Sequence, residues 1–286
     1  MADPSSNNSS SLPLVLIDGL NLLWRAAFGF PARIKNRRGE DITAAFGFFS
    51  LLGVALRHIA PPQECIVCFD GQSGAQARQQ VDEEYKQNRN GLDFSHLAAL
   101  PFIKKGLDSI NISWIELETA EADDLIATLA HKFSTRHVYI VSTDRDFYQL
   151  INAVVSVLNT QKRADHLIGP STLISAYGVT PEQWCDFRAL TGDPADNISG
   201  IRGIGPKTAA RLLKGGARLE DLRNCRKEVI GERLMGSIEG AWDELFRWRE
   251  LLRLKSDLPI PDGLVCNRSV ILPFRARSIM ESIGLA

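Results

Sequence analysis

The sequence lacks any apolar run approaching the roughly 20 residues that a membrane-spanning helix needs. Its opening stretch, MADPSSNNSSS, also lacks the apolar segment of a secretion signal. These first residues are polar and rich in Ser and Asn, a composition typical of disorder. We therefore predict a disordered tail over residues 1–11, no membrane association and a cytoplasmic location.

Cysteine is also scarce. The chain has five cysteines, an odd number, so the sequence indicates no disulfide framework. Cys65 and Cys68 have the CxxC spacing, but they lie in ECIVCFDG, which has the pattern of a strand. Side chains an odd number of residues apart on a strand point to opposite faces of the sheet. We predict two separate buried thiols rather than a shared metal site or a redox pair.

Neither sign of charge dominates, because 33 basic residues stand against 34 acidic ones and the formal net charge is −1. A total near zero neither favours nor excludes a nucleic-acid partner, so the distribution of the charges has to decide. With 286 residues and a hydrophobic content of 44%, the chain is long enough for one large domain or two modest ones with a full hydrophobic core.

Short apolar runs rich in β-branched residues alternate with longer helical patterns, such as those at 43–58 and 124–133. This alternation predicts an α/β fold with a mostly parallel central sheet flanked by helices. Several of the runs are apolar nearly throughout, as expected of strands that are covered on both faces. The pattern does not determine the order of the strands in the sheet. The candidate strands are 14–17, 65–69, 112–117, 138–142 and 154–158.

Beyond about residue 160 the pattern changes to helices joined by Gly-rich loops, without a further convincing strand. Thr180 and Gln183 are spaced for a capping box around Pro181, and Pro206 is placed to open another helix. We therefore predict an α/β core and a helical C-terminal region that begins with a helical hairpin. Residues 71–110 are polar and form an insertion in the core. The predicted ranges are 12–180 for the core, 181–286 for the helical region and 181–216 for the hairpin.

Acidic residues follow four of the five candidate strands. A single Asp after a strand is usually a turn or helix-cap residue, and one acid of EADD could cap its helix. The carboxyl ends of parallel strands meet at one sheet edge, however, and crowded carboxylates need cations to relieve their repulsion. Two Mg²⁺ or Mn²⁺ ions with such oxygen ligands are suited to hydrolysing a phosphodiester. The acids are Asp18, Asp70, Glu121, Asp123, Asp124, Asp144 and Asp146, with Asp193 and Asp196 in a C-terminal loop.

Without these nine acids, 33 basic residues face 25 acidic ones, so the rest of the chain carries about +8 and can attract phosphates. In NISGIRGIGPKTAARLLKGG, glycines allow close approach of free backbone N–H groups to a phosphate, and lysines supply charge. The predicted DNA contacts in this stretch are Gly203, Gly205, Lys207, Thr208 and Lys214. A plain helical hairpin without a DNA contact is the alternative interpretation.

The insertion contains EEYKQNRN, in which Tyr85 accompanies the cations Lys86 and Arg89. If this stretch is helical, the two cations share a face at the i, i+3 spacing. An aromatic ring for stacking and cations for phosphates are the usual means of binding a single strand. A solvated charged helix is the alternative.

The motifs together resemble those of the bacterial and phage 5′ nuclease family, whose flap endonuclease fold is also the N-terminal domain of bacterial DNA polymerase I. The stretches that carry the resemblance are LVLIDGLNLLWRA, RRGEDITAAFGFF, VCFDG, EEYKQNR, EADDLIATLA, IVSTDRDFYQL, ALTGDPADNISGIRGIGPKTAARLL and LLRLKSDLPI. They run in order from about residue 12 to the C-terminus. We therefore expect a stand-alone bacterial flap endonuclease.

The resemblance implies a PIN-like two-metal nuclease with a helical arch over 71–110, where Lys86 and Arg89 lie over the scissile phosphate. It also implies a helix–three-turn–helix that grips duplex DNA and holds K⁺ on backbone carbonyls, and a DNA contact for Arg25 in the first motif. Asp124 and Asp193 match two extra bacterial acids. The implied first metal site is Asp18, Asp70, Glu121 and Asp123, and the second is Asp144, Asp146 and Asp196.

The chain departs from the family pattern at one place. The spacing between Asp70 and Arg78 is one residue longer than usual, and Ala77 stands where an aromatic residue precedes the Arg. The metal-ligand positions are unaffected, but the role of Arg78 cannot be carried over on spacing alone.

We predict a monomeric, nucleoid-associated enzyme that cleaves DNA with 5′ flaps, nicks or gaps and acts as a 5′→3′ exonuclease. A haloacid-dehalogenase-type phosphatase would need Asp-x-Asp, whereas Leu20 stands two residues after Asp18. A PIN-type ribonuclease has the acidic core but lacks the arch and the Gly-rich hairpin. A non-catalytic DNA-binding module would lack the full set of acids.

Overall fold

The computed structural model describes residues 12–61, 63–89, 93–161, 167–224, 232–261, 264, 270 and 273–286. Its centre is a six-stranded sheet in the order β3-β2-β1-β4-β5-β6, in which the first five strands are parallel and β6 is antiparallel to β5. The strands are β1 Leu14–Asp18, β2 Glu64–Phe69, β3 Ser113–Glu116, β4 Val138–Val141, β5 Val155–Leu158 and β6 Leu167–Ile168.

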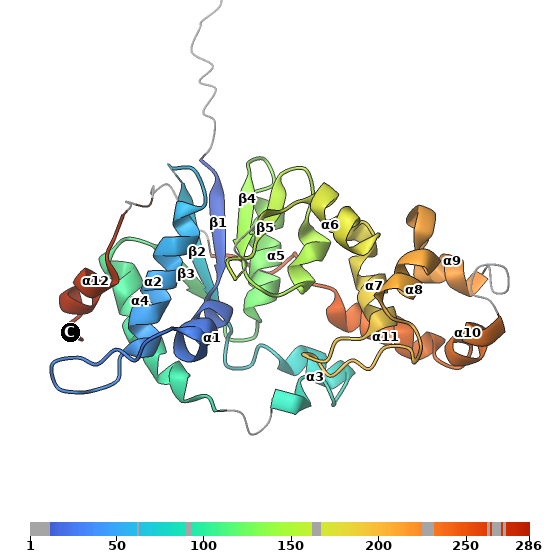
Figure 1. Cartoon of the computed structure of the whole chain (residues 1–286), viewed down its shortest axis with the longest axis horizontal. Coiled ribbons are helices and arrows are strands. Elements are labelled where there is room, and N and C mark those ends of the chain that lie inside the picture. Colours follow the sequence, from blue (N-terminus) through green and yellow to red (C-terminus); the bar gives the residue numbers. More distant parts are fainter. Residues whose placement is uncertain are drawn as a thin grey trace, which may run out of the picture.

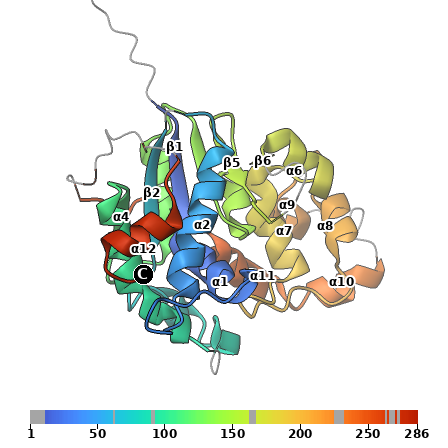
Figure 2. The same cartoon turned by 60° about the vertical axis from the view of Figure 1, so that its left-hand side comes forward.

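Helices cover both faces of the sheet, which is why β1 and β2 are apolar nearly throughout (Figures 1 and 2). Val15 and Ile17 pack on one side with Phe48, whereas Leu14 and Leu16 face the other side. The first face is covered by α1 Gly19–Gly29, α2 Thr43–Arg57, α4 Leu100–Ser109 and α12 Ala276–Ser282. The second face is covered by α5 Ala122–Lys132 and α6 Pro170–Tyr177, with the C-terminal helices behind them.

The five strands and two helices predicted from the sequence are confirmed, with ends that differ by a few residues. Cys65 and Cys68 lie in the two opposite core clusters, as their spacing predicted, and both side chains are buried. The sequence missed β6, because this strand has only two residues and lies at the edge with its side chains partly or fully exposed. No helix among the described residues is long and apolar enough to cross a membrane.

The helical region starts with the predicted capping box of Thr180 and Gln183, although the first turn is a 3-10 helix. Helix α8 opens at Pro206 as predicted, and Gly215 takes a left-handed φ of 78° shortly after it ends. The elements of this region are η4 Pro181–Gln183, α7 Trp184–Thr191, α8 Pro206–Leu212, η5 Lys214–Gly216, α9 Leu219–Asn224, α10 Glu232–Ile238 and α11 Trp242–Leu252.

The insertion after β2 crosses below the carboxyl ends of the strands, from α3 beside α11 to α4 on the other side (Figure 1). Its described parts are α3 Gln76–Val81, η1 Gln87–Arg89, η2 Ser95–Ala99 and α4. The condition under which Lys86 and Arg89 would share a helix face is not met, because the stretch is not one continuous α-helix. Lys86 has a φ of 56°, which a helix interior does not allow, and the chain around it forms turns.

Candidate metal centre and DNA-binding surface

Four of the predicted acids line one cavity of about 470 Å³ at the carboxyl edge of the sheet, together with Lys86. Asp18 ends β1 and Asp70 directly follows β2, while the other two follow β3 and β4. The Asp70 carboxylate accepts a hydrogen bond of 2.6 Å from the N–H of Ala122, so a strand-end acid caps helix α5. The sequence thus placed these acids correctly at one edge. They are Asp18, Asp70, Asp123 and Asp144.

Burial and mutual repulsion perturb these carboxylates. Asp18 accepts hydrogen bonds from Asn21 N–H at 3.0 Å and Ser142 Oγ at 2.8 Å, yet burial raises its pKa to about 7. Burial, followed by the charges of Asp18 and Asp144, raises the pKa of Asp123 well above its usual range. Burial is the main cause of both shifts and neighbouring carboxylates add to them, and a bound cation would favour the charged form of each acid.

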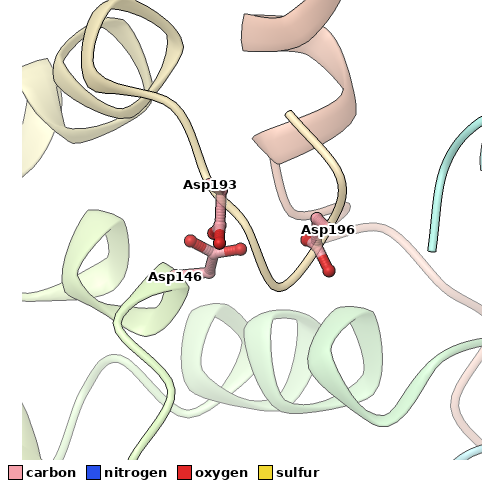
Figure 3. A group of neighbouring side chains, drawn as sticks. All are labelled: Asp146, Asp193 and Asp196. Atoms are coloured by element: carbon pink, nitrogen blue, oxygen red, sulfur yellow. The ribbon is translucent and has the colours of Figure 1, made fainter. Parts of the chain in front are cut away.

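A second group joins Asp146 from η3 Asp146–Leu150 with Asp193 and Asp196 from the loop between α7 and α8. One carboxylate oxygen from each lies within 4.8 Å of the others (Figure 3). Arg188 contacts Asp193 and lies 3.6 Å from Asp146. A buried oxygen of Asp146 has no hydrogen-bond partner. Hard oxygen donors with unused capacity suit a divalent cation, so this group fits a metal site.

Glu121 and Asp124 have a different environment, because both are paired with cations. Glu121 contacts Arg78 and lies 2.5 Å from Lys86 Nζ. Asp124 forms a bidentate pair with Arg78 at 2.7 and 3.0 Å and accepts a bond of 2.9 Å from Lys255 N–H. Burial raises the pKa of Glu121, but Lys86 and Arg78 outweigh that effect and hold the pKa below its usual range. The assignment of Glu121 to the first metal stays a prediction.

Arg78 therefore lies at the acidic edge, even though its spacing from Asp70 is longer than the family pattern. The residue is 6% exposed. Sequence reasoning could not assign its partners, because they come from elements distant in the chain. Arg188 was also missed: it is five residues before Asp193, and only the turn after α7 brings the two side chains together.

The stacking role predicted for Tyr85 does not agree with the structure. The Tyr85 side chain is 4% exposed and its hydroxyl lies 3.4 Å from Glu121, so the ring has no face open to a base. Lys86 Nζ lies 4.9 Å from the centre of this ring. The side chain of Arg89 lies outside the described part of the structure.

The Gly-rich hairpin has the expected form. Gly203 has a φ of 88°, which favours glycine, and Gly205 stands at the N-cap of α8, where Thr208 N–H donates to its carbonyl at 3.0 Å. Lys207 and Lys214 are exposed, as a phosphate contact requires. By contrast, Arg25, another predicted DNA contact, is half-buried and donates to Thr160 Oγ1 at 2.8 Å.

A parallel sheet with acids at its carboxyl edge, followed by a helical region, defines a resolvase-like, PIN-type α/β fold joined to a SAM-like helical domain. Residues 13–178 match the 5′-3′ exonuclease N-terminal resolvase-like domain, and residues 179–267 match the 5′-3′ exonuclease C-terminal SAM fold. The chain belongs to the 5′-3′ exonuclease family. The resemblance seen in the motifs and the fold class are thereby confirmed.

Two curated relatives are bacterial polymerases. The chain is 37% identical over 257 residues to the thermostable DNA polymerase I of Thermus thermophilus, covering 89% of this chain and 30% of the polymerase. It is 36% identical over 251 residues to DNA polymerase I of Bacillus subtilis, covering 86% of this chain and 28% of the polymerase. The chain thus spans about 30% of the length of these relatives.

Solved structures share the fold. The T5 D15 protein co-crystallized with metal ions has a TM-score of 0.68 at 21% identity, covering 84% of this chain and 89% of that one. The catalytic core of Rad2 in complex with DNA substrate has a TM-score of 0.59 at 12% identity, covering 97% of this chain and 88% of that one.

Proposed function

We propose that the protein is a structure-specific 5′ nuclease that hydrolyses DNA phosphodiesters, both as a flap endonuclease and as a 5′→3′ exonuclease. The main support is the convergence of strand-end acids on one cavity, beside a second acidic group that joins Asp146 to two acids on the loop of the Gly-rich hairpin. Membership of the exonuclease family agrees with this activity. Solved structures of the same fold include a complex with a DNA substrate and one with metal ions.

The proposed cofactors are two divalent cations, Mg²⁺ or Mn²⁺. The first would be held by Asp18, Asp70 and Asp123, with Glu121 released from its ion pairs. The second would be held by Asp144, Asp146 and Asp196, with Asp193 beside them. When bound, such ions neutralise phosphate charge and lower the pKa of water. Asp124, which is held by Arg78 and Lys255, would steady helix α5 behind the site rather than bind an ion directly.

The chain itself would position the DNA. The ammonium group of Lys86 reaches the acidic cavity and would offset charge on the phosphate that is cleaved, together with Arg89 three residues later in the sequence. The hairpin around Gly203 and Gly205 would grip the duplex through backbone N–H groups, with Lys207 and Lys214 adding charge and K⁺ held on its carbonyls. Arg25, which is half-buried and donates to Thr160 Oγ1, would add a secondary contact.

We further propose a nuclease core over residues 12–180 with its arch over 71–110, and a DNA-binding region over 181–286. The tail predicted over residues 1–11 lies outside the described residues. The proposed partners are DNA molecules with flaps, nicks or gaps, bound by a monomer in the bacterial cytoplasm near the nucleoid.

Cleavage of a 5′-labelled flap in Mg²⁺ or Mn²⁺ tests the proposal. We expect cutting near the flap junction and its loss in Asp144→Ala. Asp257→Ala, which removes an exposed acid, is the control and should keep the wild-type rate. A wild-type protein that cuts plain single-stranded RNA but no DNA flap would support the PIN-type ribonuclease instead. Binding of the flap without metal-dependent cleavage would point to a non-catalytic module.

A further inference from the structure

The arch and the acidic loop between α7 and α8 are joined by reciprocal hydrogen bonds. Asn197 Nδ2 on the loop donates to the carbonyl of Glu84 on the arch at 2.9 Å. Asn88 Nδ2 on the arch donates to the carbonyl of Pro194 on the loop at 2.6 Å. Each segment thus donates one hydrogen bond from a side-chain amide and accepts one at a backbone carbonyl. The two bonds hold the two segments together at two points.

Lys86 lies between these two bonds, and its own N–H points to the carbonyl of Asp196 at 3.4 Å. Lys86 and Asn197 are two of the three non-glycine residues with positive φ in the described part of the chain, at 56° and 62°. Such a backbone costs free energy in a lysine, so it persists only where the surroundings hold it. Here it turns the ammonium group toward Glu121 and into the acidic cavity.

We infer that Asn197 and Asn88 are positioning residues for Lys86. Their amides lock arch residues 84–88 onto the loop that carries Asp193 and Asp196, and so keep the ammonium group at the cavity. This inference rests on the proposed function, in which Lys86 acts on the cleaved phosphate. Because the same loop belongs to the hairpin that is proposed to grip duplex DNA, the placement of Lys86 depends on the part of the protein that holds the substrate.

Two substitutions at Asn197 distinguish the effect of losing the side-chain amide from the effect of straining the left-handed backbone. Asn197→Gly removes the amide and tolerates the positive φ, so it introduces no strain. Asn197→Asp keeps the shape but sets a carboxylate oxygen against the Glu84 carbonyl. Asn111, which also has a positive φ of 54° and lies between α4 and β3, provides the matched control Asn111→Gly. Asn88→Asp tests the second bond independently.

We expect the single-turnover cleavage rate of the flap to fall about tenfold in Asn197→Asp, and by a smaller factor in Asn197→Gly. The Kd for the same flap, measured by fluorescence anisotropy in EDTA, should stay within about twofold, because the hairpin still grips the duplex. Asn88→Asp should behave like Asn197→Asp, and Asn111→Gly like the wild type. A weaker Kd with an unchanged rate in both Asp variants would overturn the inference.

A double-mutant cycle with Lys86→Met distinguishes positioning from a general structural role. If Asn197 acts through Lys86, Asn197→Asp should slow cleavage no further once the lysine is gone. Equal slowing in both backgrounds would overturn the inference while leaving the nuclease assignment intact. A Lys86→Met protein with the wild-type rate would overturn the proposed role of Lys86 and this inference with it. A wild-type protein that cuts no flap would instead refute the proposed function.

Discussion

Arg78 and Asp124 form a buried bidentate pair, with Arg78 Nη2 at 2.7 Å from Asp124 Oδ1 and Nη1 at 3.0 Å from Oδ2. Arg78 also contacts Glu121 and donates to the carbonyls of Leu251 at 3.0 Å and Arg253 at 3.2 Å. One guanidinium therefore joins the start of the insertion after β2, the acidic helix α5 and the C-terminal end of α11. The N–H donors of this guanidinium each have a carboxylate or carbonyl acceptor, an arrangement that suits the planar fork of an arginine.

Arg78→Met should destabilise the protein strongly. The substitution leaves Glu121 and Asp124 buried with less positive charge beside them, and breaking a buried pair from one side costs about 3–5 kcal/mol. Arg78→Lys should recover only part of this loss, because an ammonium group cannot make the bidentate contact. The free energy of unfolding from urea titrations measures both effects.

The control for this prediction is Arg277→Met. Arg277 is an exposed arginine that pairs with Glu281 at 3.1 Å on the surface of α12, and its side chain is 77% exposed. An exposed pair of this kind contributes about 0.3–0.5 kcal/mol. Equal losses in the two arginine variants would contradict a special role for the buried pair.

Asp146→Asn should stabilise the metal-free protein at pH 8. Burial, followed by the charges of Asp144, Asp196 and Asp193, raises the pKa of Asp146 well above its usual range. The native state therefore favours the neutral form, which Asn imitates, and we expect a gain on the order of 1–2 kcal/mol. The gain should shrink as the pH falls, because the native aspartate then takes up its proton. Thermal unfolding of the two proteins in EDTA, at pH 8 and at lower pH values, measures the difference in stability.

Asp186→Asn is the matched control and should have the opposite sign. Asp186 is 0% exposed, but it is paired with Arg218 at 2.7 Å and Arg249 at 3.4 Å. Removing its charge leaves two guanidinium groups without their buried partner, so the free energy of unfolding should fall. Loss of stability in both asparagine variants would show that the acidic group around Asp146 stores no repulsion.

The sheet and the gathering of acids at its edge could be predicted because both depend on local patterns. Runs such as 14–17 and 65–69 are apolar and β-branched, and parallel strands bring the residues that follow them to one edge. The edge strand β6 could not be predicted, since a two-residue strand with exposed side chains has no periodicity to detect.

The cations that balance the acids were harder to find. Arg78 and Arg188 bind carboxylates that lie in other elements or beyond a turn, so neither pairing follows from spacing along a helix or strand. The left-handed backbone of Lys86 is also imposed by tertiary contacts, which is why a helical pattern there was misleading. The buried ring of Tyr85 has the same cause, because the turn that contains it packs against Glu121.

Stabilisation by Mg²⁺ should depend on pH. Asp18 has its pKa raised by burial from the ordinary 3.8 to about 7, so its favourable contribution to stability is complete below pH 3.8 and is lost as the pH rises through 7. Above pH 7 the carboxylate is charged and available to a cation. An ion at about 100 times its Kd stabilises by about 2.7 kcal/mol per site. The rise in Tm on adding Mg²⁺ should thus be larger at pH 8 than at pH 6, and equal rises would contradict the predicted site.

Lys207→Ala should weaken duplex binding uniformly and reduce its dependence on salt. Lys207 is exposed beside the turn at Gly203 and Gly205, where the backbone can approach a phosphate closely. A lysine that neutralises one phosphate releases about one counterion, so the slope of log K against log salt should fall by about 0.9. Anisotropy titrations at several salt concentrations measure the slope.

The control is Lys132→Ala, at the far end of α5. This substitution should leave the salt slope unchanged, because α5 runs away from the acidic edge. An unchanged slope in Lys207→Ala would place the duplex elsewhere on the protein.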